Sequence, residues 1–382
     1  MNFFSFSIPS EIIFGVDSVL MMGDYIKKYG NKVIIITEQK FYDTKYIERL
    51  EKILKSFFID YLIYDEINSD SGSEDINSIN ILTRTARANV VIGMGGQRIL
   101  NISKLVSLFA YNEKSFYYLL KNKEELKQKI PVILIPTTPR DYFALSDTSY
   151  YLDQDTGNLK LFSDRSLFAD YILVDPTFTV DISKKVMSAM LIEMICFCID
   201  SILSKKSTIF TDTLLYKSIE TINKNFKNAI EYLEDLEVKK ELSLSGLFLM
   251  ISGRIAGFSL LHALTLAVTS ILKIPKIMAS IILAPNVIEF FVSYSPEKLT
   301  KVTQCLNLKT ENLSTLESAL LVPEYIQKLI SEYDLPSRLS YFNVQKEIIG
   351  KIVDEAFNFD ILFNSSKAFS KEDIFNIIYS SL

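Results

Sequence analysis

The strongest constraint on the fold is a change of hydrophobic pattern near the middle of the 382-residue chain. In the first half, short runs rich in β-branched residues alternate with amphipathic stretches. The runs are Lys32–Thr37, Ile59–Asp65, Ala88–Gly93 and Pro131–Pro136, and the stretches are Asp43–Phe57, Ser73–Arg87 and Ile99–Tyr111. Buried strands that alternate with helices form parallel sheets through right-handed crossovers. We therefore predict an α/β N-terminal domain with a parallel sheet.

The end of this domain is indicated by a hairpin and one more strand. The hairpin consists of Thr148–Asp153, a turn at 155–158 and the run NLKLF, and the last strand is Tyr171–Asp175, closed by Pro176. The segment Asn68–Asp75 is predicted as a polar loop. Two domains follow, an α/β domain at 1–178 and an all-α C-terminal helical domain at 179–382.

From Asp181 onward apolar residues recur at helical spacing, which predicts a domain made only of helices. The predicted helices are 184–203, 210–233, 242–272 as one helix or two, 276–292, 313–332, 344–357 and 371–381. The stretch Ile255–Leu272 has 18 residues without a charge, and we predict a buried helix there rather than a membrane span.

Several function classes are excluded by small residue counts. One histidine and three cysteines leave no zinc module rich in Cys and His, and we expect free thiols. Twelve glycines are fewer than half the number expected from a usual share of about 7%. The net charge of −5 gives no electrostatic case for nucleic acid. The N-terminal residues lack the pattern of a secretory signal, so we expect a cytoplasmic protein.

The order and spacing of seven sequence landmarks resemble the iron-containing alcohol dehydrogenase family, which shares its fold with dehydroquinate synthase and glycerol dehydrogenase. The landmarks are SIPSEIIFG at 7–15, GMGGQRILNISK at 93–104, IPTT at 135–138, DQDTGNLK at 153–160, LVDP at 173–176, DSILSKKS at 200–207 and HALTL…IPK…LAPNVIEFF at 262–291. The resemblance implies a Rossmann-like first domain, an interdomain cleft and an NAD(P)-dependent oxidoreductase ancestry.

The residues at the cofactor-binding positions of the family are partly replaced. In the family's G-G-G-S-x-x-D-x-x-K motif, Gly95, Gly96 and Lys104 are kept, while Gln97, Arg98 and Asn101 stand at the third Gly, the Ser and the Asp. The family's A-G-T-G-S-E loop is replaced by residues 139–144, which include bulky Tyr142 and Phe143. The expected cofactor-binding residues are Glu38, Gly95, Gly96, Arg98, Lys104, Thr137, Thr138 and Arg140.

Two interpretations of the added arginines stay open. Arg98 and Arg140 could bind a small phosphate or carboxylate ligand through their guanidinium groups. Alternatively, Arg140 pairs with Asp141 and Arg98 is solvated on the first turn of its helix. NAD(P) is a candidate cofactor, although none is certain, because the replaced loops have lost the glycines that let a backbone approach phosphate.

The resemblance also implies a divalent metal held by one Asp and three His, and these positions carry Glu193, Phe197, Leu266 and Lys276 here. Only Glu193 among these four could ligate, so we expect no iron or zinc. His262 is kept beside them. Lys276 and Glu193 are expected to face each other, either as a structural ion pair or, together with His262, as catalytic residues.

Two functional hypotheses follow. In the first, the chain is a metal-free relative without alcohol dehydrogenase activity, and it acts as a binding or assembly partner with a protein or a small anion in its cleft. In the second, it is a metal-independent NAD(P)H-dependent oxidoreductase that acts on a carbonyl or alcohol substrate with Lys276 and His262 in place of the metal. A homo-oligomer is compatible with either hypothesis.

Overall fold

The computed structural model describes residues 6–68, 70–179 and 182–382. Contacts divide the described chain into two units, residues 6–179 and residues 182–382. The prediction had placed the division after residue 178. The first unit is an α/β domain and the second consists of helices, as the sequence pattern predicted.

The first unit is built on a six-stranded sheet, within the described residues, in the order β1-β8-β5-β4-β2-β3. All of its neighbouring strands pair in parallel. The strands are β1 (Glu11–Phe14), β2 (Lys32–Glu38), β3 (Asp60–Ile67), β4 (Val90–Gly95), β5 (Val132–Pro136) and β8 (Tyr171–Val174). The central strands β2, β4 and β5 are buried on both faces, which explains their unbroken β-branched runs.

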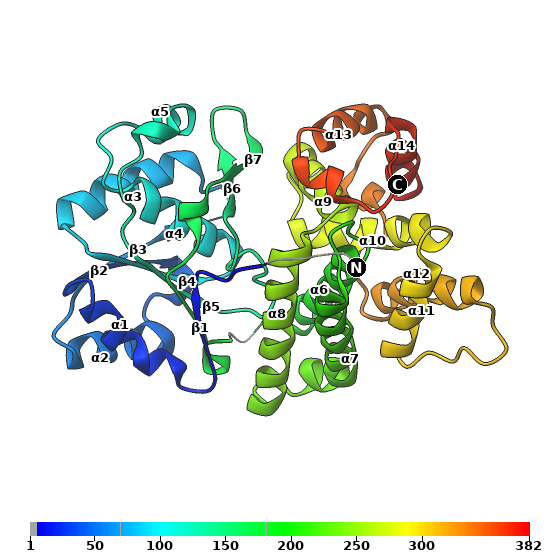
Figure 1. The fold of residues 1–382 in the computed structure, drawn as a ribbon, viewed down its shortest axis with the longest axis horizontal. Helices are drawn as coiled ribbons and strands as arrows, with labels where there is room; N and C mark the ends of the chain where they lie inside the picture. Colours follow the sequence, from blue (N-terminus) through cyan, green and yellow to red (C-terminus); the bar gives the residue numbers. More distant parts are fainter. Residues whose placement is uncertain (1–5, 69, 180–181) are drawn as a thin grey trace. The chain divides into compact units, whose positions relative to one another are not determined.

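Helices cover both faces of this sheet. Helices α1 (Met22–Lys27) and α2 (Lys45–Ser56) lie on one face, and α3 (Ser73–Ala86) and α4 (Gln97–Phe109) lie on the other (Figure 1). Short α5 (Phe116–Lys121) precedes β5. The antiparallel hairpin β6 (Thr148–Asp153) and β7 (Asn158–Ser163) stands outside the sheet, with the predicted bounds for its first strand.

One predicted loop is partly wrong. The segment 68–75 was predicted to be a polar loop, but α3 already begins at Ser73. The Asp75 carboxylate accepts a hydrogen bond from the Gly72 N–H at 2.8 Å, so the acidic residues of this segment cap a helix. A side chain at Gly72 would collide with the carbonyl oxygen of Leu152, which lies 2.1 Å from an ideal Cβ position.

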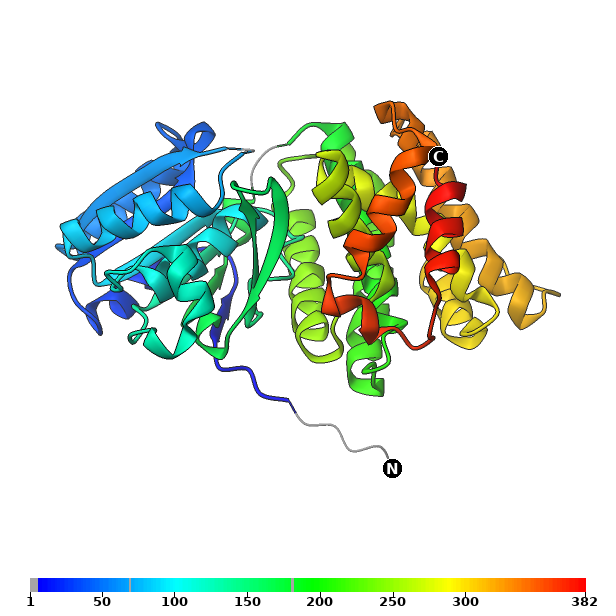
Figure 2. The ribbon, with the colours of Figure 1, turned by 90° about the horizontal axis from the view of Figure 1, so that it is seen from above.

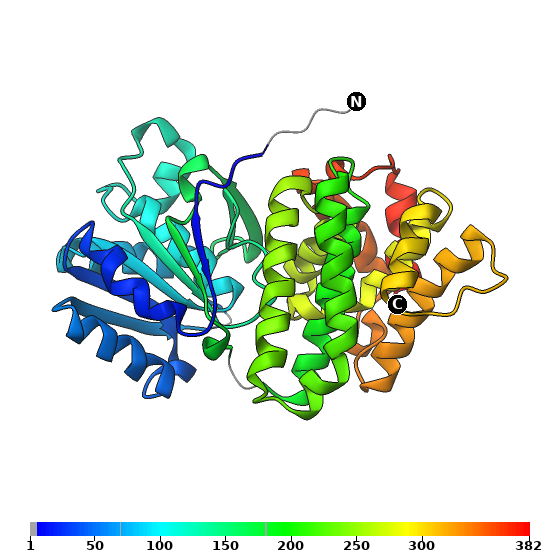
Figure 3. The same ribbon diagram turned by 60° about the horizontal axis from the view of Figure 1, so that its bottom comes forward.

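The second unit contains nine helices within its described residues. They are α6 (Lys184–Ile202), α7 (Ile209–Glu231), α8 (Leu236–Ala256), α9 (Leu260–Leu272), α10 (Lys276–Val292), α11 (Pro296–Cys305), α12 (Thr315–Glu332), α13 (Ile349–Ala356) and α14 (Lys371–Ser380). The long helices α7 and α8 run side by side (Figure 3). Helix α6 is buried almost throughout and forms the centre of the unit.

The predicted helix over 242–272 is two helices, and its start lies at Leu236. Helices α8 and α9 meet at an angle of 99°. The break falls at Gly257, whose φ of +73° favours glycine, and an added Cβ there would meet the Asn364 side chain at 2.5 Å. Among the described residues, no single helix is long and apolar enough to cross a membrane, and only the bent α8–α9 pair meets a length and composition test.

Candidate functional site

Several of the predicted cofactor-binding residues of the first unit, among them Glu38 and Gly95, lie at the carboxyl edge of the parallel sheet. The chain reverses its direction of winding between β2 and β4, which are neighbours, and ligands bind parallel sheets at such a switch point. Glu38 ends β2, Gly95 ends β4, and Pro136 of β5 is in register with Gly95. The Glu38 carboxylate forms an ion pair with Lys40.

The two glycines of the first loop differ in how closely the rest of the domain packs against them. A Cβ at Gly95 would meet the Ile99 side chain at 2.6 Å, so Gly95 is required for the close packing of β4 on α4. Gly96 has no heavy atom within 4 Å of its Cβ position and precedes the first turn of α4. Arg98, on that turn, donates to the carbonyl oxygen of Asn68.

The second loop follows β5 and consists of side chains that pack or bond locally. Thr137 is buried, and its N–H donates to the Gly95 carbonyl at 3.1 Å. The Thr138 hydroxyl donates to the Asp141 carboxylate at 3.0 Å. Tyr142 and Phe143 are buried and have ring centroids 5.6 Å apart. The family resemblance implies small residues at these two positions, which are filled by bulky aromatic side chains here.

The two loops are fixed to each other by three residues of α4. Gln97, Asn101 and Lys104 are spaced at i, i+4 and i+7, so they lie on one face of the helix. The Gln97 amide donates to the Arg140 carbonyl at 2.6 Å, and the Asn101 amide oxygen accepts from the N–H of Tyr150 at 3.2 Å. Residues that replace the family's glycine and aspartate thus hold the segment 140–150 in place.

Lys104 completes this arrangement from inside the domain. Its side chain is 1% exposed, and its ammonium group donates to the carbonyl oxygens of Phe143 at 3.0 Å, Ser146 at 2.8 Å and Thr148 at 2.8 Å. The three N–H bonds of the ammonium group are all used, which gives Lys104 a structural role. Its predicted role in cofactor binding stays a prediction.

The pKa of Lys104 provides a test of this structural role. Burial lowers the pKa of this ammonium group to about 7, against an opposing effect of the Asp147 charge. Below pH 7 both the folded and the unfolded chain hold the proton, so folding bears the full cost of burying the charge. Between pH 7 and the ordinary lysine value of 10.5 only the unfolded chain holds it, and stability should rise with pH.

We expect the free energy of unfolding of the wild-type chain to rise relative to that of Lys104→Met by up to about 1.4 kcal/mol per pH unit between pH 7.5 and 9.5. Urea unfolding of both proteins across this pH range measures the difference between their free energies of unfolding. The other titrating groups contribute equally to both proteins, so their contributions cancel in this difference. Parallel curves for the two proteins would contradict the placement of a charged lysine in this interior.

In the second unit, three helices bring the predicted catalytic residues together. Glu193 and Phe197 lie on α6, His262 and Leu266 on α9, and Lys276 begins α10. All three helices contact one another. Glu193, Phe197, His262 and Leu266 are fully buried. The positions that the family resemblance relates to a metal therefore share one buried junction of α6, α9 and α10.

His262 lies between aromatic rings. Its ring centroid is 5.2 Å from that of Phe197 and 5.2 Å from that of Phe258, and both pairs are edge-to-face. Burial lowers the pKa of His262 well below its ordinary value, and the nearby charge of Lys276 lowers it further. The imidazole is therefore neutral at physiological pH, and it is held as a core residue.

Glu193 is held by a residue that sequence reasoning did not single out. The hydroxyl of Ser280, one turn after Lys276 on α10, donates to the Glu193 carboxylate at 3.2 Å. Lys276 itself is half-buried, and its charge acts on His262. Glu193, His262 and Lys276 thus lie on three helices that contact one another, and their catalytic role stays a prediction.

The donor set of this junction does not fit a catalytic metal. Phe197 and Leu266 have no lone pair to donate, and the ammonium group of Lys276 would repel a cation. Glu193 and His262 remain, and two ligands fall short of the three protein ligands that catalytic zinc sites use. Within the described ranges, no three His, Cys, Asp or Glu side chains lie close enough to hold a metal ion.

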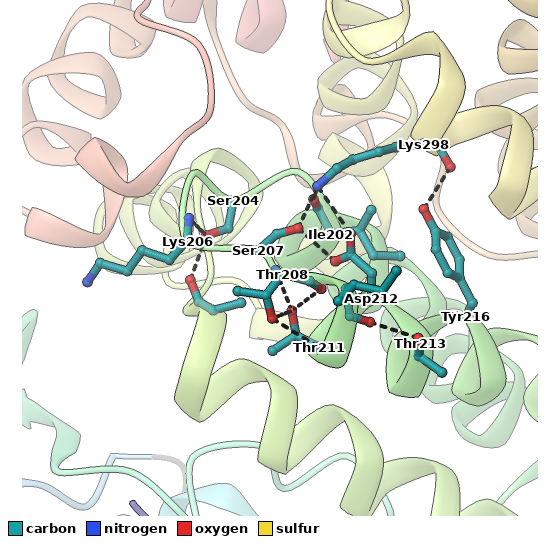
Figure 4. Close-up of polar contacts among 12 residues, drawn as sticks. Ile202, Ser204, Lys206, Ser207, Thr208, Thr211, Asp212, Thr213, Tyr216 and Lys298 are labelled. Carbon is teal, nitrogen blue, oxygen red and sulfur yellow. Dashed lines mark hydrogen bonds and ion pairs between the residues drawn. The ribbon is translucent and has the colours of Figure 1, made fainter. Parts of the chain in front are cut away.

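The C-terminal end of α6 is fixed by a polar network around Lys298 of α11 (Figure 4). The Lys298 ammonium donates to the carbonyl of Ile202 at 2.6 Å and to the hydroxyl of Ser207 at 2.5 Å, and it lies 3.3 Å from the Asp212 carboxylate. The Ser207 hydroxyl donates to Asp212 at 2.7 Å. This network sets where α6, and therefore Glu193 and Phe197, lies in the unit.

The first unit is a parallel α/β domain with loops at the carboxyl edge of its sheet, and the second is a helical domain with polar residues at the junction of three helices. Together they define a two-domain dehydrogenase fold. The chain belongs to the iron-containing alcohol dehydrogenase family. The sequence-family model for iron-containing alcohol dehydrogenase matches residues 9–176. The sequence-family model for the C-terminal region of Fe-containing alcohol dehydrogenases matches residues 186–382. The predicted family and fold class are confirmed.

Individual relatives are distant. The probable alcohol dehydrogenase EutG of Escherichia coli (strain K12) is 23% identical over 336 residues, which cover 88% of this chain and 84% of that protein. The sulfoacetaldehyde reductase of Bilophila wadsworthia (strain 3_1_6) is 21% identical and covers 96% of both. The structure of an alcohol dehydrogenase from Oenococcus oeni superposes with a TM-score of 0.92 at 19% identity, covering 100% of both chains.

Proposed function

We propose that this chain is a metal-free member of its oxidoreductase family that lacks the family's alcohol dehydrogenase activity and acts as a binding or assembly partner. The observation that carries the proposal is the donor set at the junction of α6, α9 and α10. Phe197, Leu266 and Lys276 stand where the family resemblance places three histidines, and none of them can serve as a metal ligand at neutral pH.

The two loops that follow β4 and β5, where the family resemblance implies a dinucleotide, support the same proposal. Phosphate binding by a glycine-rich loop depends on backbone N–H groups that a ligand can approach closely. Here Gln97, Asn101 and Lys104 of α4 direct their polar groups to the segment 140–150, and Tyr142 and Phe143 replace small residues. These hydrogen bonds stabilise the segment in a form that does not depend on a nucleotide.

The magnitudes favour loss of activity over a substitute mechanism. Polarisation of a carbonyl by a metal is worth several kcal/mol of transition-state stabilisation, and each 1.4 kcal/mol is a factor of ten in rate. An ammonium group could recover part of this loss. It could not recover the cofactor affinity that the replaced loops forfeit.

A second candidate function is a metal-independent NAD(P)H-dependent oxidoreductase in which Lys276 polarises a carbonyl and His262 relays a proton. The observation that favours it is the electrostatic effect of Lys276 on a neutral imidazole. We rank it second because His262 is completely buried between two phenylalanine rings, where a substrate has no access to it.

The test is a titration of the purified chain with NADH and NADPH, followed by fluorescence, and an assay with short primary alcohols and aldehydes in the presence of Fe²⁺ or Zn²⁺. We expect no saturable binding up to about 1 mM, so any binding free energy would be weaker than about −4 kcal/mol. We also expect no turnover above the rate in buffer without protein. Turnover that persists when the metal is omitted, disappears in Lys276→Ala and remains in Lys301→Ala, an exposed lysine of α11, would contradict the proposal and establish the second candidate.

The assembly part of the proposal has its own readout. The chain, purified from its own cells under native conditions, should elute in size-exclusion chromatography together with a second protein, in a complex whose mass by light scattering is not a multiple of the monomer mass. Elution as a monomer at all concentrations would contradict a role in assembly.

A further inference from the structure

A groove in the helical unit, formed by α10, α12, α14 and the connection after α12, is not explained by the dehydrogenase ancestry. Its two cavities have volumes of about 290 Å³ and about 330 Å³ and share Asn286 and Ser380. Helix α14 is the red helix in Figure 2, at the C-terminal end of the fold. Each cavity is near the lower end of the 300–1,000 Å³ typical of small-molecule sites.

The first cavity has an apolar floor and polar walls. Ile282, Pro285 and Ile330 form the floor, and the walls carry Arg338 together with the polar side chains of Asn286, Gln327, Ser331, Ser337 and Ser380. Within the described chain, Arg338 forms no ion pair, and no acidic side chain lines this cavity. A planar guanidinium group with no internal partner is suited to a carboxylate, which it binds through two parallel hydrogen bonds.

The charge count in this cavity favours a monoanion. Arg338 is the single charged residue among those that line it. A phosphate monoester carries a charge of about −1.5 to −2 at pH 7, so one cation would leave much of its charge uncompensated. A carboxylate carries one charge and is matched by one guanidinium group. The apolar floor is suited to a short hydrocarbon chain next to that carboxylate.

The second cavity has the opposite charge. It is lined by Glu289 and Asp373, together with Asn286, Phe290, Asn376, Ile377 and Ser380. Asp373 accepts the N–H of Ser370 at 2.7 Å, and hydrogen bonds from Ser370, together with the Lys367 charge, lower the pKa of Asp373 against the effect of burial. Glu289 has no hydrogen-bond or ion-pair partner among the described residues and is exposed. Glu289 is therefore the carboxylate available to a ligand cation.

We propose that this groove binds an amino carboxylate, with the ligand's carboxylate at Arg338 and its ammonium group at Glu289. The two charged residues line separate, neighbouring cavities that share Asn286 and Ser380, so the two charges of the ligand must be several bonds apart. The side-chain amides of Gln327 and Asn376 offer hydrogen bonds in the two cavities, whereas the Asn286 amide nitrogen already donates to the Ser381 hydroxyl at 2.8 Å. This inference goes beyond the proposed function, because it needs neither a metal nor a nicotinamide.

The experiment compares three probes by isothermal titration calorimetry on the full chain: 6-aminohexanoate, hexanoate and hexylamine. We expect 6-aminohexanoate to bind at least tenfold more tightly than either singly charged probe. Arg338→Gln should lower its affinity at least tenfold, and Glu289→Gln should reduce it to that of hexanoate.

Matched control variants remove the same charges outside the groove. Lys328→Gln and Glu324→Gln change exposed residues of α12 that do not line either cavity, and they should leave the affinity unchanged. Equal binding of the three probes, no binding at 20 mM, or equal losses in the groove and control variants would each overturn the inference. None of these outcomes depends on whether the chain binds NADH or a metal.

Discussion

Replacing Asp200 with alanine is expected to lower the free energy of unfolding by about 3 kcal/mol, the largest single-residue effect on stability that we predict. Asp200 lies on α6 and is 2% exposed. Its carboxylate accepts the N–H of Ser259 at 2.7 Å, the hydroxyl of Ser259 at 2.8 Å and the N–H of Leu261 at 3.0 Å. The N-terminal turn of α9 would keep these buried donors without acceptors after the substitution.

The measurement is urea unfolding of Asp200→Ala with Asp360→Ala as the matched control. Asp360 is exposed and has no hydrogen-bond or ion-pair partner in the described chain, so its loss should change stability by less than about 0.5 kcal/mol. Asp200→Asn, which keeps an acceptor oxygen, should lie between the two. If Asp200→Ala is as stable as the control, Asp200 does not hold α9 in place.

Restoring the family's ligand set should create a metal site at the junction of α6, α9 and α10. The variant combines Glu193→Asp, Phe197→His, Leu266→His and Lys276→His and keeps His262. Because α6, α9 and α10 already meet at this junction, the new side chains should converge on one point. We expect Co²⁺ or Zn²⁺ to bind with a dissociation constant of about 1 µM or lower, and the melting temperature to rise on metal addition.

The visible absorption of bound Co²⁺ reports the ligands directly. A control that keeps Phe197 but carries the other three substitutions should bind metal at least 100-fold more weakly, because one ligand of α6 is missing. A folded four-fold variant that binds no metal would show that the backbone of this junction differs from the arrangement the family resemblance implies.

The fold was predictable because its main elements have strong patterns. The buried strands β2, β4 and β5 were recognised from their β-branched runs, and α6 and α10 from long apolar periodicity. Short helices were predicted unevenly, because ten residues or fewer contain only two or three turns in which a period can show: α13 and α14 were recognised, whereas α1, α5 and α11 were missed. The break between α8 and α9 was left open, since one glycine in an apolar stretch does not by itself indicate a turn.

The site was predictable only where a residue's type settles its chemistry. A phenylalanine has no lone pair and a protonated lysine repels a cation, so neither replaces a histidine as a metal ligand at neutral pH. The hydrogen bonds of Gln97, Asn101 and Lys104 could not be predicted, because each joins α4 to a segment about 40 to 50 residues away. The same holds for Ser280 and Glu193, which are 87 residues apart. No local signal in the sequence indicates such pairs.

The central claim is that the junction of α6, α9 and α10 has lost its metal while the fold is kept. Calorimetric titration of Zn²⁺ and Fe²⁺ into the wild-type chain, after treatment with a chelator, tests this most directly. We predict no stoichiometric binding, and the same weak heats for Glu193→Gln as for the wild type. One equivalent of metal bound by the wild type, with binding lost in Glu193→Gln, would contradict the account.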